Sequence, residues 1–182
     1  ESDGAYDSAE HDSEFKTPPL GHVRIAFGSD NPENWTNITL ASGSDVASPE
    51  DAAIADVNDD GFPDIMIASE LGHLIYFQNP THDIRESAWA RLILPSSQGR
   101  GSYLRTFFAD FEGDGRPEAT GANKGAQRPG PQDLIKSNPV SIFKVKGDPL
   151  TGASWQEEVL GHYSIPQNAE PIDLDGDGDP DI

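Results

Sequence analysis

A short acidic loop occurs three times in this chain, each time after an apolar run. The copies occupy residues 56–64, 110–118 and 173–181, and their first acids are 54 and 63 residues apart. Each copy follows the form D-x-[DNE]-x-D-G-x-P-[DE]. A repeat of this length restricts the fold to architectures that are assembled from similar units.

Tryptophans and apolar runs recur together with the loops. Trp35, Trp89 and Trp155 stand 21, 21 and 18 residues before the first acids of the three loops. Within each unit, the short apolar runs between turn-forming residues predict four short strands. In the first complete unit we expect these strands at 52–56, 65–68, 73–78 and 89–94.

The central strands of a unit are continuously apolar rather than alternating. The runs at 65–68 and 74–77 contain Ile-Met-Ile-Ala and Leu-Ile-Tyr-Phe. Such runs are typical of strands that are buried on both faces. Blades stacked around an axis bury both faces of each sheet, so the pattern favours a β-propeller. No segment has a sustained helical period with caps.

We therefore predict an all-β fold, a partial β-propeller of four-stranded blades. Two full blades are expected at 52–94 and 104–160, with parts of two more at 22–40 and 172–182. Residues 1–21 read as a flexible acidic leader, and 22–182 as the repeat array. Propellers close with four to eight blades, so we expect an array truncated at its C-terminus or self-association that covers the open ends.

The acidic loops have the composition of calcium sites. Ca²⁺ takes six to eight oxygen ligands, and alternate side chains of a tight loop can converge on one ion while Gly at position six permits the turn. The alternative is a set of solvated turns. An EF-hand is a poorer match, because its last ligand stands at position twelve and helices flank its loop.

The predicted donors are side chains at positions one, three, five and nine and the backbone carbonyl at position seven, so up to three structural Ca²⁺ ions are expected. The three sets are Asp56, Asn58, Asp60, Phe62 and Asp64; Asp110, Glu112, Asp114, Arg116 and Glu118; and Asp173, Asp175, Asp177, Asp179 and Asp181. The second loop carries Glu at positions three and nine, and we expect it to be the weakest site.

These loops resemble the FG-GAP/VCBS repeat family, which includes the integrin α-chain head and many secreted microbial proteins. The resemblance covers about residues 22–182 and rests on the motif D-x-[DN]-x-D-G-x-x-D. It implies a bladed propeller with structural calcium on one face. It implies no particular activity, because this fold carries many functions.

A ligand site is expected on the face opposite the acidic loops. There the connection after 118–122 is long, and it carries Lys124 and Arg128 in a very acidic protein. Neighbouring connections add Arg100 and His162 to this face. Long loops on a rigid scaffold are often functional. These four residues are the predicted binders of an anionic or polar sugar; the alternative is an ordinary exposed loop.

Charge excludes some partners. The net charge of −20, from 32 acids and 12 bases, argues against nucleic acid or an anionic membrane surface. No apolar run is long enough to span a membrane. The chain begins at Glu1 without a signal-peptide pattern and is interpreted as a processed product or fragment of an extracellular protein. Acceptor patterns at Asn34 and Asn37 would permit N-glycosylation there.

The leading functional hypothesis is a secreted calcium-binding module for carbohydrate or extracellular protein ligands. One alternative is an enzyme, a propeller-type sugar lyase or dehydratase in which the basic loop stabilises a developing carboxylate or enediolate. Another is an adhesion scaffold. The sequence favours binding over catalysis, because it contains no metalloprotease, nucleophile-elbow or phosphate-loop motif.

Overall fold

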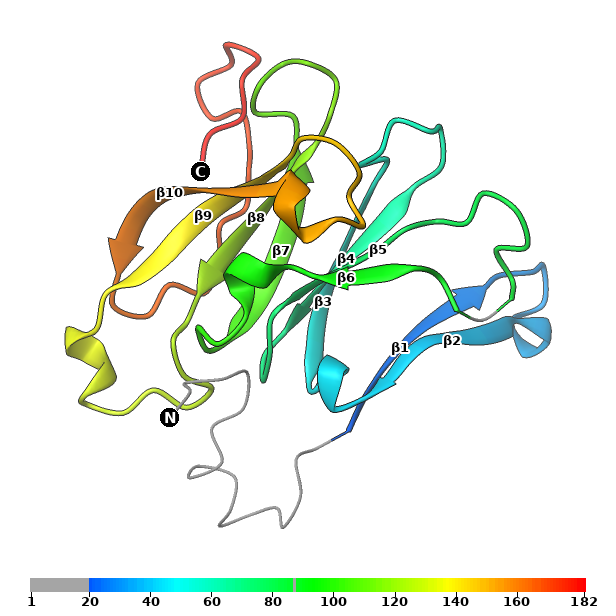
Figure 1. Cartoon of the computed structure of the whole chain (residues 1–182), viewed down its shortest axis with the longest axis horizontal. Helices are drawn as coiled ribbons and strands as arrows, with labels where there is room; N and C mark the ends of the chain where they lie inside the picture. The colour runs from blue at the N-terminus through cyan, green and yellow to red at the C-terminus, as the bar shows by residue number, and fades with distance from the viewer. Residues whose placement is uncertain (1–19, 87) are drawn as a thin grey trace.

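The computed structural model describes residues 20–86 and 88–182, which form three antiparallel sheets arranged side by side (Figure 1). The predicted leader, 1–21, lies outside the described residues except for Leu20 and for Gly21, which begins the first strand. The strands are β1 (Gly21–Phe27), β2 (Thr36–Gly43), β3 (Pro49–Ala55), β4 (Asp64–Ser69), β5 (Leu74–Phe77), β6 (Arg91–Ile93), β7 (Tyr103–Ala109), β8 (Glu118–Asn123), β9 (Asn138–Val145) and β10 (Trp155–Tyr163).

Each larger sheet follows the chain order without crossovers. The first sheet pairs β1 with β2, the second has the order β3-β4-β5-β6, and the third has the order β10-β9-β8-β7. Short connections of this kind are typical of antiparallel meanders. Five single-turn 3₁₀ helices lie in the connections, and the described residues contain no α-helix. They are η1 (Pro32–Asn34), η2 (Ser44–Val46), η3 (Pro95–Ser97), η4 (Asp133–Ile135) and η5 (Gly152–Ser154).

The central strands are buried on both faces, as their continuous apolar runs predict. Every residue of β4 and β5 is buried. One hydrophobic cluster joins the first and second sheets through Val23, Ile38 and Phe77, among others. A second cluster joins the second and third sheets through Tyr76 and Phe143, among others. The sheets therefore pack face against face rather than edge to edge.

The repeated tryptophans have a shared local role. Each indole Nε1 donates a hydrogen bond to a backbone carbonyl five or six residues upstream. The pairs are Trp35 with Ser29 (3.2 Å), Trp89 with Ile84 (3.4 Å) and Trp155 with Pro149 (2.8 Å). Trp89 and Trp155 are buried in the two clusters, in agreement with packing between sheets, whereas Trp35 is 47% exposed.

The all-β prediction is confirmed, and the described sheets do not close into a ring. Some strand limits differ from the prediction. Strand β3 begins at Pro49 and ends at Ala55, one residue before the predicted Asp56. The reason is local: the carboxylate of Asp56 accepts bonds from loop N–H groups and so belongs to the loop. Strand β6 is shorter than predicted and begins after Trp89.

Within residues 20–86 and 88–182, no helix has the length and apolar character that crossing a bilayer requires.

Candidate metal-binding loops and the opposite face

The three acidic loops lie on the same side of the molecule, at the top in Figure 1. The first connects β3 to β4, and the second connects β7 to β8. The third follows the crossing segment after β10, and the isolated bridge between Ile172 and Asp181 closes its base. The strands thus deliver the predicted donors to the ends of neighbouring sheets.

The carboxylate at position one accepts two backbone hydrogen bonds in each loop, and the one from position six is common to all three. Asp56 accepts the N–H of Asp60 at Oδ1 (3.1 Å) and of Gly61 at Oδ2 (2.7 Å). Asp110 accepts from the two equivalent residues at 3.0 and 2.8 Å. In the third loop Asp173 accepts from Gly176 at 2.7 Å and from Gly178 at 3.1 Å. One carboxylate therefore folds each loop back on itself.

Positions five and nine repeat a second set of bonds. At position five, one carboxylate oxygen accepts the N–H two residues later. At position nine, one oxygen accepts the N–H of position two, which ties the two ends of the loop together. The position-five acceptors are Asp60, Asp114 and Asp177, each at 2.9 Å. The position-nine acceptors are Asp64 (3.2 Å), Glu118 (2.8 Å) and Asp181 (2.9 Å).

The backbone of each loop is left-handed at positions four and six. Left-handed residues let successive N–H groups and alternate side chains face the inside of a tight loop. The φ angles at position four are 60° at Asp59, 65° at Gly113 and 80° at Gly176. At position six they are 86° at Gly61, 86° at Gly115 and 99° at Gly178. In all three copies, the backbone conformation at position six therefore explains why the motif has glycine there.

Family comparison agrees with this geometry. Residues 56–119 match the FG-GAP-like repeat family. The match begins at position one of the first loop and ends one residue beyond position nine of the second, so it contains both loops and the strands between them. The predicted resemblance to FG-GAP repeats is confirmed. No curated protein matches the chain.

The carboxylates converge most closely in the third loop, outside the FG-GAP-like segment. Single oxygens of Asp173, Asp175 and Asp177 lie within 4.8 Å of one another, and all three side chains are exposed. In the first loop position three is Asn58, whose amide hydrogen-bonds Asp60 Oδ2 at 2.9 Å. In the second loop position three is Glu112, whose carboxylate contacts Lys144 at 2.9 Å. The three loops therefore share a backbone but differ in how their acids are partnered.

Position nine is buried at the start of the next strand in the FG-GAP-like segment. Asp64 accepts bonds from the Tyr76 hydroxyl (2.7 Å) and the Asn79 N–H (2.8 Å) as well as from Val57. Burial raises the pKa of Asp64, and these bonds oppose the rise. Burial likewise raises the pKa of Glu118, and the neighbouring acids of its own loop add to that rise. A cation beside these groups would favour their ionised form.

The sequence did not point to Tyr76, Asn79 or Lys144 as functional residues. Tyr76 lies in a continuous apolar run, so it reads as core, and only its hydroxyl reveals the contact with Asp64. Lys144 lies at the end of an apolar run at 140–145, far from Glu112 in sequence. Alignment of the two four-stranded units would have found it, because the equivalent residue of the first unit, Gln78, is uncharged.

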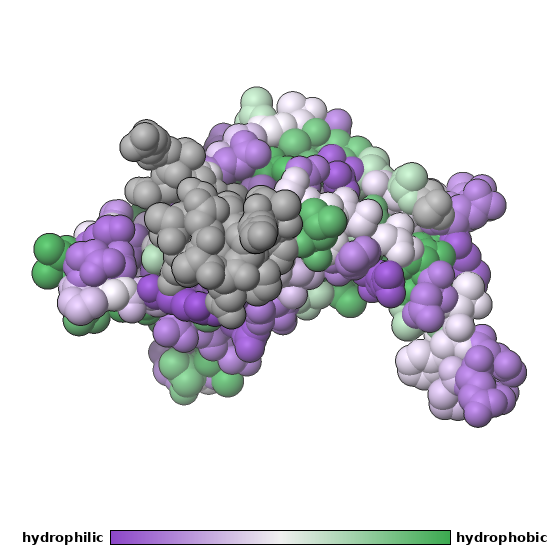
Figure 2. Space-filling view, turned by 90° about the horizontal axis from the view of Figure 1, so that it is seen from below, coloured by the Kyte–Doolittle hydropathy of each residue, from purple (hydrophilic) through white to green (hydrophobic). Residues whose placement is uncertain are grey.

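The opposite face lies at the bottom of Figure 1. Of the four predicted ligand residues, Arg100 and His162 lie together in one pocket, whereas Lys124 lies elsewhere. The long connection after β8, with η4 in it, extends from this side. Figure 2 views this side, where hydrophilic and hydrophobic side chains of the described residues are interspersed. Arg100 and His162 line one pocket together with Asn138 and Val159. Lys124 instead pairs with Glu70 in the neighbouring sheet.

Two of these cations already have carboxylate partners. Lys124 is only 5% exposed, and its Nζ lies 2.8 Å from Glu70 Oε1. The Nη1 atom of Arg100 lies 2.6 and 2.7 Å from the two oxygens of Glu157. The backbones also approach closely here, since a Cβ at Gly101 would lie 1.7 Å from the Gly125 carbonyl oxygen. Arg128 is exposed on the long connection.

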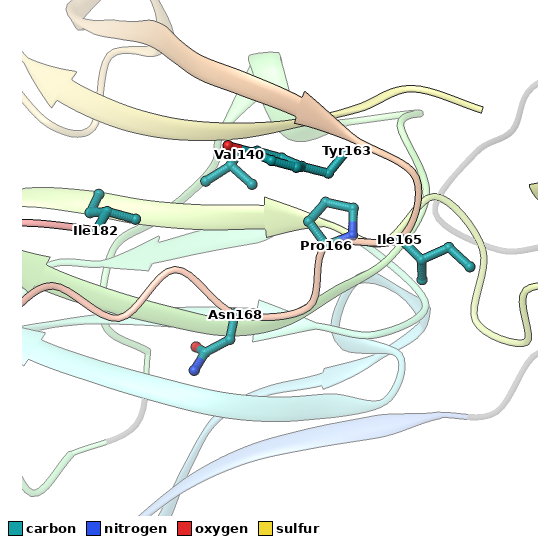
Figure 3. A pocket seen from close by; sticks show the side chains of 6 residues that line it. All are labelled: Val140, Tyr163, Ile165, Pro166, Asn168 and Ile182. Atoms are coloured by element: carbon teal, nitrogen blue, oxygen red, sulfur yellow. The ribbon is translucent and has the colours of Figure 1, made fainter. Parts of the chain in front are cut away.

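A second pocket lies where the chain leaves β10. Its lining residues are Val140, Tyr163, Ile165, Pro166, Asn168 and Ile182. Figure 3 shows Val140, Tyr163 and Pro166 pointing toward one another and Ile165 pointing away. The segment that follows β10 is anchored by the Thr120 hydroxyl, which donates to the Ala169 carbonyl at 2.8 Å. The pocket is thus formed by this segment crossing one face of the third sheet.

Proposed function

We propose that this chain is a calcium-binding part of an extracellular β-propeller that acts as a binding module for carbohydrate or protein ligands. The observation that carries the proposal is the hydrogen-bond pattern that the three acidic loops repeat. In every copy, position one accepts the N–H of position six, position five accepts that of position seven, and position nine accepts that of position two. A pattern built three times with the same backbone is better explained by a shared ligand than by solvated turns.

The donor set suits Ca²⁺. All the predicted side-chain donors are oxygens, which hard cations prefer, and a tight loop with several carboxylates is strongly self-repelling without a cation. Asp173, Asp175 and Asp177 converge within 4.8 Å, so the third loop fits the ion best. We propose that Asp56, Asp60 and the Asn58 oxygen hold an ion in the first loop. The ion would neutralise the loops and stabilise the sheet ends that they connect.

The blade interpretation belongs to the same proposal. Two sheets of four strands in chain order, each with an acidic loop between its first and second strands, have the arrangement of successive propeller blades. Strand β3 packs beside β7, so the first strands of the two sheets are neighbours, as inner strands around an axis would be. We propose that β1 and β2 are the outer strands of a preceding blade.

Ligand binding is proposed for the face opposite the loops. The pocket that Arg100 and His162 share offers hydrogen-bond donors together with the Asn138 amide. Such mixed polar linings with an apolar wall, here Val159, suit sugars and peptide backbones. Asn34 and Asn37 are exposed, and we propose both as acceptors of N-linked glycan if the protein passes through a eukaryotic secretory pathway.

A thermal melt with and without Ca²⁺ tests the metal part of the proposal. A ligand that binds only the folded state stabilises it by about 2.7 kcal/mol at one hundred times its Kd, so we expect a clear rise in Tm with millimolar Ca²⁺ and its loss in excess chelator. Replacing Asp173, Asp175 and Asp177 by Asn should reduce the calcium-dependent rise.

The matched control replaces three exposed acids outside the loops, Asp30, Glu33 and Glu86, by their amides. This control changes the net charge equally and should keep the full calcium response. A Tm that is indifferent to Ca²⁺ in the unmodified protein contradicts the metal proposal. For the ligand part, a glycan array probed in Ca²⁺ should give binding that Arg100→Ala weakens; turnover of a uronate substrate would instead favour the lyase or dehydratase alternative.

A further inference from the structure

The second acidic loop contacts a lysine, Lys144, whose equivalent in the register of the second sheet is a glutamine. In the second sheet, Ile65 follows position nine of its loop and pairs with Phe77. In the third sheet, Ala119 follows position nine and pairs with Phe143. The residues after these partners, Gln78 and Lys144, therefore occupy equivalent places in the two sheets.

Lys144 is held by two carboxylates. Its Nζ lies 2.9 Å from Glu112 Oε1 and 2.8 Å from Glu158 Oε2, and its side chain is 19% exposed. Lysine is charged at neutral pH, and its Nζ donates a hydrogen bond to Glu112 Oε1. Charge-assisted contacts of this length are stronger than those between neutral groups.

One of these carboxylates is a predicted metal ligand. Glu112 stands at position three, and its long side chain reaches out of the loop toward β9. The equivalent residue in the third loop, Asp175, instead points to the same place as Asp173 and Asp177. Asn58 in the first loop also remains inside its loop, bonded to Asp60. Among residues 20–86 and 88–182, the second loop is the one whose position-three side chain contacts a cationic side chain.

The rest of the second loop is already folded around its own bonds. Asp110 accepts from Asp114 and Gly115, and Asp114 accepts from Arg116, as the equivalent residues do in the first copy. The ammonium group of Lys144 places a positive charge 2.9 Å from Glu112 Oε1, at the side of the second loop. The charged Lys144 would repel a divalent ion that enters this loop. Coordination by Glu112 would also require its contact with Lys144 to break, and both effects weaken the binding of the ion.

We propose that Lys144 is the internal counterion of the second acidic loop, so that this loop folds without Ca²⁺ and the chain binds Ca²⁺ only at its first and third loops. The inference rests on the proposed calcium function of the loops. It changes the expected stoichiometry from three ions to two. The connection between β7 and β8 would then fold without calcium, whereas the first and third loops would still depend on calcium.

Calcium titration by calorimetry on the whole chain tests the proposal, with free Ca²⁺ up to about ten millimolar. We expect two ions per chain for the unmodified protein and three for Lys144→Gln, which copies the residue of the first repeat. The matched control is Lys146→Gln, which removes the same charge from a lysine that lines the pocket beside Glu112. The control should keep two ions.

Melting in excess chelator gives a second readout that does not depend on the ion count. In chelator, Lys144→Gln should lower the Tm more than Lys146→Gln does. Added Ca²⁺ should remove this difference in Tm between the two variants. Combining Lys144→Gln with Glu112→Gln should cost less than the sum of the two single changes, because each removes the other's partner.

The outcomes separate this inference from the function on which it rests. Three ions in the unmodified protein, or two in both the unmodified protein and Lys144→Gln, overturn the role of Lys144. An unmodified protein that binds no Ca²⁺ contradicts the proposed function instead. In that case the melts in chelator decide the role of Lys144, which equal Tm values for Lys144→Gln and Lys146→Gln overturn.

Discussion

Single backbone positions decide whether the acidic loops can form. Gly61 has φ +86°, and a Cβ placed on it would meet no atom within 4 Å. The requirement for glycine there is therefore conformational and not steric. Asp59, two residues earlier, takes a left-handed φ of 60° without being glycine, at a position where the other loops have Gly113 and Gly176. Asp tolerates this region better than most residues do.

We expect Gly61→Ala to lower the free energy of unfolding by about 1 kcal/mol or more, because alanine is strained at positive φ. The change should also weaken Ca²⁺ binding, since the Gly61 N–H holds Asp56 Oδ2 at 2.7 Å. Urea unfolding in chelator measures the first effect and calcium titration the second. The control is Gly28→Ala, whose added Cβ would meet only Trp35 at 3.6 Å, an ordinary contact. Equal costs for both changes would refute the backbone explanation.

At the scale of whole elements, the sequence predicted which strands exist better than it predicted what they contact. The runs at 65–68 and 74–77 identified β4 and β5 because burial on both faces leaves an unbroken apolar pattern. The acids of the loops identified the turns. Partners that come from distant strands were not predicted, since nothing local links Lys144 to Glu112 or Lys124 to Glu70.

The contact between the second and third sheets depends on a glycine that the sequence did not single out. A Cβ on Gly121 of β8 would lie 3.1 Å from Leu74 Cδ1 in the second sheet and 3.1 Å from Phe143 Cε2 in its own. The absence of a side chain thus lets Leu74 reach the third sheet. No sequence motif identifies this glycine, because the residue that requires the space, Leu74, lies 47 residues away in the sequence.

We expect Gly121→Val to destabilise the protein by about 1–3 kcal/mol, the usual cost of overpacking a close-packed core. Gly121→Ala should cost less, because one methyl group can be accommodated by small shifts of two side chains. Chemical denaturation measures both. Ser42→Val, on an exposed position of β2, serves as the control and should stay within about 0.5 kcal/mol of the unmodified protein. A larger loss at Ser42 than at Gly121 would contradict the packing argument.

At the scale of the whole molecule, charge opposes folding. The chain carries 32 acids and 12 bases, and the three loops bring four, four and five of those acids together on one side. Such self-repulsion destabilises the compact state. Several of the few bases form salt bridges with acids: Lys144 with Glu112 and Glu158, Lys124 with Glu70, and Arg100 with Glu157.

We therefore expect the calcium-free protein to gain stability with ionic strength, because salt shortens the Debye length from about 30 Å at 0.01 M to about 10 Å at 0.1 M. Melting in chelator from low to high NaCl should raise the Tm by several degrees, and choline chloride should act equally, since screening does not depend on the cation. In saturating Ca²⁺ the same series should be flatter, because bound ions already offset the charge of the loops. If the two series had equal slopes, the loops would not be the main source of the repulsion, and the stabilising role proposed for calcium would have to come from contacts other than charge compensation.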